Sequence, residues 1–205
     1  MYELAGDLED VNVAPGSNLL VLGQAMTGKQ RLTHEILARG AIGGDGTIIV
    51  STSDGAGHVI RAFEQAIGEV NEEPVVGVID CVSGEQVDDD LEGSYQIRYA
   101  SSPVDMTGIG INLSELLETF HEEKRLERNR VMLDNISTML MYSNLQTIFR
   151  FLHVFTGRVQ NADGLGLYLL DPSAHDAQTL NTLKGLFDGM IEIEDDEVTF
   201  TGVEV

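Results

Sequence analysis

The residues best suited to chemistry form one glycine-containing octapeptide. It fits the pattern G-x-x-x-x-G-K and lies between an apolar run and a segment of helical period; its residues are Gly23, Gln24, Ala25, Met26, Thr27, Gly28, Lys29 and Gln30. In that context backbone N–H groups and a helix N-terminus point at phosphates, and the lysine reaches the β and γ oxygens. The octapeptide therefore predicts a phosphate-binding loop. The simpler alternative is a glycine turn that happens to carry a lysine.

The last position of this loop departs from the usual pattern. Gln30 stands where Ser or Thr normally supplies a hydroxyl to Mg²⁺. The amide carbonyl of Gln is a weaker ligand on a longer side chain, and Mg²⁺ demands tight octahedral geometry. We therefore expect ATP or ADP as the ligand of the loop, and weak binding of Mg²⁺.

Asp80, Asp134 and Asp171 each end an apolar run. The carboxyl ends of parallel strands line the ligand crevice of a doubly wound sheet, so all three are candidates to face the loop. Asp134 follows the loop by about a hundred residues, and we predict that it holds Mg²⁺ through water. For Asp80, and for Asp171 with Pro172 behind it, a turn-initiating cap is the simpler interpretation.

The elements that must position these residues alternate between β-branched runs and segments of helical period. This alternation predicts an α/β fold, with a mostly parallel central sheet flanked by helices and a closing antiparallel hairpin. Residues 106–111 look like a flexible glycine loop, with a helix starting at Asn112. We expect one domain over 1–205 with an acidic loop inserted at about 83–93. The expected strands are 18–23, 47–51, 74–80, 95–99, 130–134, 164–171, 190–194 and 198–203, and the other expected helices are 29–39, 57–67, 145–159 and 176–186.

The charge balance excludes several classes of partner. The chain has 34 Asp and Glu against 12 Lys and Arg, a net charge of -22. Such a surface repels nucleic acids and anionic lipid, which are bound largely through Lys and Arg. The composition is typical of a halophilic, archaeal type of protein, because molar salt shortens the Debye length to about 3 Å. The alternative is a mesophilic protein that avoids acidic partners.

The remaining constellations predict structure more than chemistry. The lone Cys81 excludes an intramolecular disulfide and is expected to be a buried small hydrophobe. Lys124, Arg125, Arg128 and Arg130 alternate with glutamates, which favours a salt-bridged, solvated helix face over a nucleic-acid site. With no run of 18 apolar residues and an acidic start, the chain is expected to be cytoplasmic and not inserted in a membrane.

The chain resembles the RecA superfamily, most closely its archaeal KaiC-like branch, over about residues 12–200. The resemblance rests on the order of these elements, on the loop, and on the segments 130–140 and 183–194. The resemblance implies a P-loop, Walker A type of ATP-binding domain that forms rings or filaments, in which a neighbouring subunit completes the nucleotide site. It implies that Lys29 contacts phosphates and that Asp134 holds the metal. The apolar run 139–142 is either core or a subunit contact, and because such rings place this region near the subunit interface, the resemblance favours a homo-oligomer.

Two further positions depart from that branch. Its glutamate pair, which activates the attacking water, corresponds here to Ser53 and Asp54. A general base must reach the water it activates, so Asp54 is at best a weak substitute catalytic base. The arginine or lysine finger of such rings lies on the last strands, yet only Lys184 follows Arg158 among the basic residues. A missing finger costs several powers of ten in rate.

Three functions remain open from the sequence. The first is a regulatory or signalling KaiC-like protein that binds ATP or ADP with little or no hydrolysis and acts through contacts with protein partners of unknown identity. The second is an active RecA-like ATPase in DNA recombination or repair. The third is a structural pseudo-ATPase that has lost its nucleotide.

Overall fold

The computed structural model describes residues 1–84, 95–194 and 197–202. Its strands are β1 (Tyr2–Glu3), β2 (Asn12–Val13), β3 (Asn18–Gly23), β4 (Gly46–Ser51), β5 (Val76–Asp80), β6 (Tyr95–Tyr99), β7 (Asn129–Leu133), β8 (Leu165–Leu170), β9 (Gly189–Glu194) and β10 (Glu197–Gly202). Its α-helices are α1 (Lys29–Ile42), α2 (Ala56–Ile67), α3 (Met106–Glu122), α4 (Ile136–Tyr142), α5 (Leu145–Asn161) and α6 (Ala177–Lys184), with short 3₁₀ turns at Gly6–Leu8 and Pro172–Ala174.

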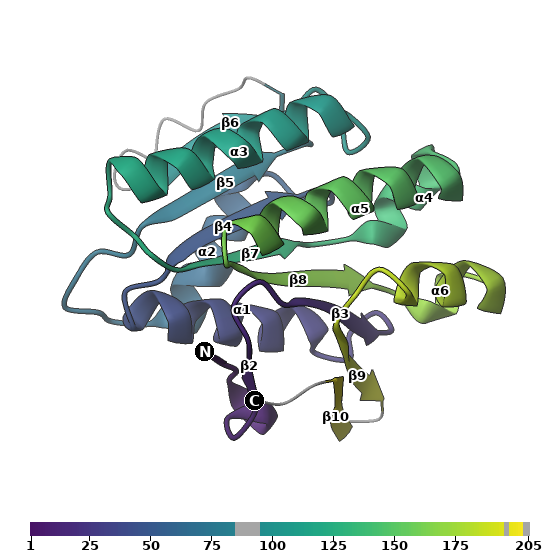
Figure 1. Ribbon diagram of the computed structural model, residues 1–205, viewed down its shortest axis with the longest axis horizontal. Helices are drawn as coiled ribbons and strands as arrows, with labels where there is room; N and C mark the ends of the chain where they lie inside the picture. The colour runs from purple at the N-terminus through teal and green to yellow at the C-terminus, as the bar shows by residue number, and fades with distance from the viewer. Residues whose placement is uncertain (85–94, 195–196, 203–205) are drawn as a thin grey trace.

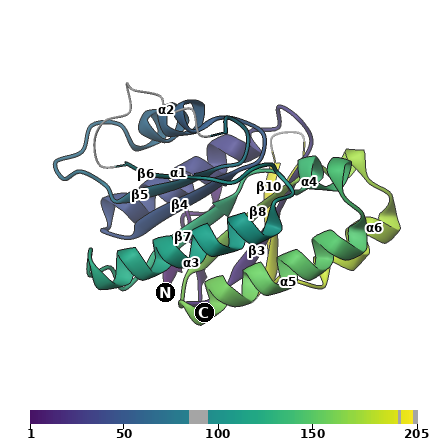
Figure 2. The ribbon, with the colours of Figure 1, turned by 90° about the horizontal axis from the view of Figure 1, so that it is seen from above.

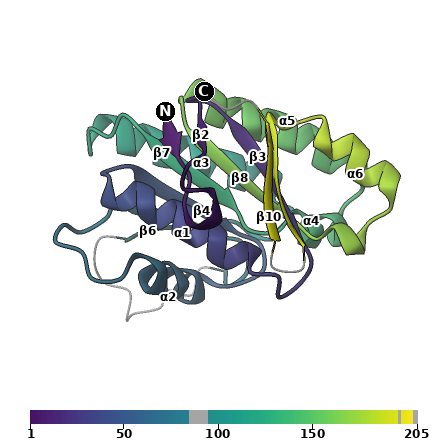
Figure 3. The same ribbon diagram turned by 90° about the horizontal axis from the view of Figure 1, so that it is seen from below.

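The centre of the molecule is an 8-stranded sheet in the order β10-β9-β3-β8-β7-β4-β5-β6. Strands β9 to β6 in this order are parallel, and β10 closes the sheet as an antiparallel partner of β9. Figure 1 shows the sheet with its helices, and Figure 3 shows the closing hairpin beside β3. The predicted α/β architecture with a closing hairpin is therefore confirmed.

Helices cover the sheet on both faces. Figure 2 shows α1 and α2 on one side, and α3 and α5 on the other. Strand β3 is buried along its whole length, and its side chains alternate between the two layers. Leu19 and Val21 belong to the apolar cluster under α1 and α2, whereas Leu20 and Leu22 belong to the cluster under α3 and α5. Because β3 is buried on both faces, its register against the neighbouring strands is fixed. The end of β3 is therefore held in place at the carboxyl edge of the sheet.

The expected glycine loop at 106–111 is wrong, because α3 starts at Met106. Asp105 caps the helix by accepting the N–H of Gly108 at 2.9 Å. Gly110 leaves room for Arg158 of α5, which donates to its carbonyl; an added Cβ would lie 2.6 Å from the Arg158 guanidinium. The glycine thus serves a close approach between helices, and this packing outweighs its low helix propensity.

The expected solvated basic helix face is also wrong in part, because α3 ends at Glu122, before all four basic residues, and Arg130 is buried. Arg130 lies in β7 with its side chain only 3% exposed, and its Nε donates to Asp45 at 2.8 Å. The same guanidinium donates to the carbonyl oxygens of Glu3 and Ile36, both at 2.8 Å. Arg128 pairs with the other oxygen of Asp45 at 3.2 Å. The two arginines therefore hold the N-terminal segment and α1 against β7.

Gly40 lies just past the expected end of the helix 29–39, but it does not end that helix. It lies inside α1, and an added Cβ would lie 2.1 Å from Nε of Arg130. The helix continues to Ile42, where Gly43 caps it and Gly44 turns the chain at a φ of 86°. Gly40 is therefore required by the approach of Arg130, not by the end of the helix.

Other expectations have mixed outcomes. Cys81 is buried, as predicted, and burial raises the pKa of its thiol. Most of the expected acidic insertion at 83–93 lies outside the described residues. No helix within the described ranges is long and apolar enough to cross a bilayer.

We predict that Asp45→Ala lowers the free energy of unfolding by about 3–5 kcal/mol, because it leaves the buried Arg130 guanidinium without its partner carboxylate. Urea unfolding followed by circular dichroism in molar KCl measures this loss. The control is Glu3→Gln, which removes the exposed carboxylate that pairs with Arg39 at 2.5 Å and is expected to unfold at nearly the parent urea concentration. Equal losses in the two variants would contradict the assignment of Asp45.

Candidate functional site

The predicted phosphate loop lies where a strand of the sheet turns into a helix. Strand β3 ends at Gly23 and α1 starts at Lys29, so the structure has the expected strand, loop and helix. Gly28 precedes the helix at a φ of 85°, a left-handed conformation that glycine adopts without strain. No side chain in the described part of the chain caps α1 at Gly28. The first-turn N–H groups of α1 are thus left without a side-chain acceptor, as anion binding requires.

The loop is held in shape by its own polar groups. Lys29 Nζ donates to the carbonyl oxygens of Gly23 at 2.5 Å and of Gln24 at 3.1 Å. Thr27 Oγ1 donates to the Gln24 carbonyl at 2.9 Å, and a Cβ added to Gly23 would lie 2.6 Å from that hydroxyl. Partial burial lowers the pKa of Lys29, while the charge of Asp171 opposes that shift. The ammonium group is therefore kept over the loop, bonded to carbonyls that an oxyanion can replace.

Asp134, the predicted metal ligand, is buried between β7 and β4. Its Oδ1 accepts from the N–H and the hydroxyl of Thr52, both at 2.8 Å, and its Oδ2 accepts from the Ser51 hydroxyl at 2.8 Å. Burial raises the pKa of the carboxyl, and these hydrogen bonds oppose the rise without cancelling it. The carboxylate is thus engaged with β4, and its role toward a metal stays a prediction.

The structure brings the unusual residues of the sequence together around a small cavity. Gln30, Asp54 and Asp134 line about 40 Å³ of space, and His34 and His58 also line it. His34 is 8% exposed; its Nδ1 lies 2.8 Å from the Gln30 carbonyl oxygen, and its Nε2 has no hydrogen-bond partner within the described ranges. Burial lowers the pKa of His34, so the ring is neutral at pH 7. The cavity has room for about two water molecules.

Ser53, at the other position expected to carry a glutamate, points elsewhere. Its hydroxyl lies 3.2 Å from that of Thr138 on α4. Asn135 caps the same helix by accepting the Thr138 N–H at 3.1 Å. The turn after β4 therefore contacts the helix that follows Asp134.

The two predicted capping aspartates are confirmed as caps. Asp80 accepts the N–H of Ala56, the first residue of α2, at 2.7 Å, and also bonds the turn that follows β5. Asp171 Oδ1 accepts from the N–H and the hydroxyl of Ser173 at 2.9 and 2.6 Å. Asp171 also lies next to the loop, which agrees with its being one of the three candidates to face it. The signal for it is strand order, because β8 pairs directly with β3.

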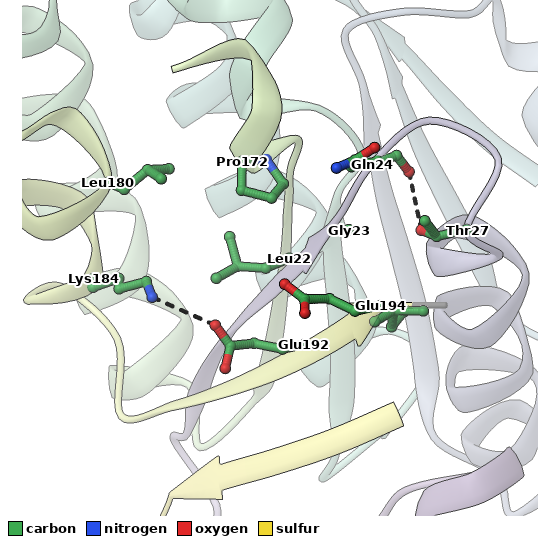
Figure 4. A pocket seen from close by; sticks show the side chains of 10 residues that line it. Leu22, Gly23, Gln24, Thr27, Pro172, Leu180, Lys184, Glu192 and Glu194 are labelled. Carbon is green, nitrogen blue, oxygen red and sulfur yellow. Dashed lines mark hydrogen bonds and ion pairs between the residues drawn. The ribbon is translucent and has the colours of Figure 1, made fainter. Parts of the chain in front are cut away.

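A larger cavity of about 420 Å³ borders the start of the loop (Figure 4). Lys184 Nζ lies 3.4 Å from Glu192 Oε1 across it. Its lining residues are Leu22, Gly23, Gln24, Thr27, Pro172, Leu180, Lys184, Glu192, Ile193 and Glu194. The sequence did not predict this cavity, although β9, which carries both glutamates, pairs with β3 in parallel. The phosphate loop therefore has acidic side chains beside it.

The sheet order, the two helical layers and the closing hairpin define a RecA-like fold of the KaiC-like type. The KaiC-like protein PH0186 from the hyperthermophilic archaeon Pyrococcus horikoshii OT3 superposes with a TM-score of 0.63 at 13% identity, over 97% of this chain and 83% of that protein. PH0250 of the same organism superposes with a TM-score of 0.60 at 12% identity, over 93% and 88% of the two chains. The uncharacterized protein PH0321, solved in complex with an unknown peptide, gives 0.67 at 12% identity, over 95% and 86%.

The chain belongs to a family of unknown function (DUF7504), whose family model matches residues 16–193. No curated protein sequence matches it significantly.

We predict that Asp134→Ala lowers the free energy of unfolding by about 3 kcal/mol, because Ser51 and Thr52 would lose their buried acceptor. Asp134→Asn is the matched variant, since its amide oxygen can still accept from Thr52 and its amide nitrogen can donate to Ser51. We expect it to remain within about 1 kcal/mol of the parent. Urea unfolding at pH 7 measures both, and an Asp134→Ala variant of parental stability would contradict the structural role.

The pH dependence of this difference is a separate prediction. Because folding raises the pKa of Asp134 above 3.8, the carboxyl takes up a proton on folding at intermediate pH. The favourable contribution of Asp134 to the free energy of unfolding is fully present below the pKa of the unfolded state. This contribution is lost as the pH rises through the pKa of the folded state. The stability of the parent relative to Asp134→Asn should therefore decrease from pH 4 upward in urea titrations. An increase would mean that the hydrogen bonds outweigh burial.

Proposed function

We propose that this chain binds ATP or ADP at the loop 23–30 with little or no hydrolysis, and that it regulates other proteins through contacts that depend on the bound nucleotide. The loop fits a phosphate chain: the first turn of α1 has no side-chain cap among the described residues, and the Lys29 ammonium lies over the loop. Binding needs those groups alone, whereas hydrolysis also needs a metal, a base and neutralisation of transition-state charge.

The observation that carries the proposal is the engagement of Asp134. Three hydrogen bonds at 2.8 Å tie its carboxylate to Ser51 and Thr52, and the residue is 4% exposed. A carboxylate held this way has little capacity left to orient a water on Mg²⁺. Gln30 supplies an amide in place of a hydroxyl, so the residues present fit a phosphate chain better than they fit its usual metal.

The remaining catalytic parts point the same way. Asp54 lies beside Gln30 and Asp134 at the 40 Å³ cavity, which leaves space for water but not for a phosphoryl group. Lys184, the last basic residue of the sequence, is paired with Glu192. These contacts support binding without efficient turnover, and they disfavour the active ATPase of recombination or repair.

Exposed apolar side chains support action through protein contacts. Met141 and Tyr142 on α4 are 78% and 67% exposed, and Met26 at the tip of the loop is fully exposed. Exposed large apolar side chains near a ligand site favour an interaction surface for a partner protein or for a second copy of the chain. Helix α4 also contacts Ser53 in the turn after β4. One structural neighbour, PH0321, was solved with an unknown peptide, which agrees with such a role.

A structural pseudo-ATPase without nucleotide is the second candidate. Lys29 argues against it, because the sequence has three lysines in all and one of them lies over this loop. A loop with no phosphate to meet gains little from a half-buried ammonium whose pKa burial lowers.

We predict that ADP and ATP bind the parent protein and that Lys29→Ala weakens both by at least about tenfold, the loss expected for a charged hydrogen-bond donor. Calorimetric titration in molar KCl, with and without Mg²⁺, measures the affinities. Phosphate release should stay below about one per minute.

The matched control is Lys124→Ala, which removes the same charge from an exposed turn away from the loop. It should bind nucleotide as the parent does. Turnover well above the stated rate would favour the active ATPase instead. No binding of either nucleotide to the parent would leave the structural pseudo-ATPase.

A further inference from the structure

Strand register places Asp171 directly beside the phosphate loop. Leu170, the last residue of β8, pairs with Leu22 of β3 in parallel. The next residue on each strand, Asp171 and Gly23, therefore enters the same edge of the sheet side by side. Pro172 lines the larger cavity together with Gly23 and Gln24, and Figure 4 shows it across from Gln24.

The Asp171 carboxylate is fixed in this position through one of its oxygens. Its Oδ1 accepts two hydrogen bonds from Ser173, one from the N–H and one from the hydroxyl. Partial burial raises the pKa of Asp171, but the bonds to Ser173, the charge of Lys29 and the N–H of Ala25 lower it on balance. The carboxylate is thus ionised at neutral pH and interacts with the same Lys29 and loop N–H that a phosphate needs.

We propose that Asp171 is a built-in anionic competitor at the phosphate loop, which lowers the affinity for the phosphate chain of the nucleotide. A phosphoryl group in the loop brings negative charge toward a fixed carboxylate, and it shares the Lys29 ammonium with that carboxylate. The attraction between loop and ligand is reduced accordingly. This inference rests on the proposed function, because it concerns the same loop.

The consequence is that the charge of Asp171 sets the affinity of the loop for the phosphate chain. With Asp171 in place, nucleotide binds weakly enough for its occupancy to follow concentration, as a regulatory protein requires. Without that charge, the same loop N–H groups and Lys29 act on the phosphate alone. Asp171 is a residue that determines affinity through its charge, and it takes no part in any bond-breaking step.

The test is Asp171→Asn, in which the amide oxygen still accepts from Ser173 while the charge is lost. We expect the variant to bind ADP and inorganic pyrophosphate about tenfold more tightly than the parent. The gain should be largest at the lowest KCl concentration that keeps the protein folded by circular dichroism, since salt screens the repulsion. Asp171→Ser is the second variant, in case the amide disturbs the turn.

The matched control is Asp176→Asn, five residues further along. Asp176 is exposed and caps α6 by accepting the Thr179 N–H at 2.7 Å, so the substitution removes the same charge from a similar cap away from the loop. Its affinity should change by less than about twofold. Equal gains in affinity for Asp171→Asn and Asp176→Asn would overturn the competitor role. Unchanged or weaker binding by both Asp171→Asn and Asp171→Ser would also overturn it. In either case nucleotide binding by the parent would still stand. If the parent, Asp171→Asn and Asp171→Ser all fail to bind ADP and pyrophosphate, both the competitor role and the proposed function are wrong.

Discussion

The buried carboxylate of Asp134 is the interaction on which the carboxyl edge of the sheet depends. It directly follows β7 and accepts hydrogen bonds from Ser51, the last residue of β4, and from Thr52 after it, so it joins neighbouring strands where their chains leave the sheet. Ser51 in turn accepts the N–H of Asp54 at 3.3 Å, so the carboxylate also shapes the turn that leads to α2. An ion of this kind is stable away from water only when its lone pairs are used. The contacts that make the edge rigid therefore engage the same carboxylate that the sequence predicts as a metal ligand.

The electrostatics of the loop reflect a balance on a very acidic chain. The net charge is -22, yet the loop keeps a lysine and an open helix start. Asp171 on one neighbouring strand and Glu192 on the other place acidic groups on both sides of β3. The proposed binding of a nucleotide would depend on short-range groups, because the long-range field of the protein repels an anion. In molar salt that field is screened within a few ångströms. The groups of the loop and its neighbours would then determine its affinity for an anion.

Much of the fold could be predicted from the sequence, because local signals determine it. The apolar run before Gly23 and the helical period after Lys29 predict the strand, loop and helix, and β-branched runs predict the parallel sheet. Contacts between distant residues could not be predicted. Asp134 accepts hydrogen bonds from Thr52 and Ser51, which lie 82 and 83 positions away, and Arg130 donates to Asp45 at a separation of 85. The helix at 106–111 was missed because Gly110 makes room for Arg158, which lies 48 residues further along the chain.

The contact between Gly40 and Arg130 has an evolutionary consequence. Any side chain at position 40 would occupy the space of the guanidinium, since even a Cβ would lie 2.1 Å from Nε. The two positions are thus coupled: a lineage that replaces Arg130 with a short apolar residue frees position 40 for alanine, and a lineage that gains alanine there first must lose the arginine. Intermediates carrying alanine with arginine are disfavoured, so the order of substitutions is constrained. Within this family, glycine at 40 should accompany arginine at 130, and this pairing should mark the chains whose N-terminal segment is bound to β7 in the same way.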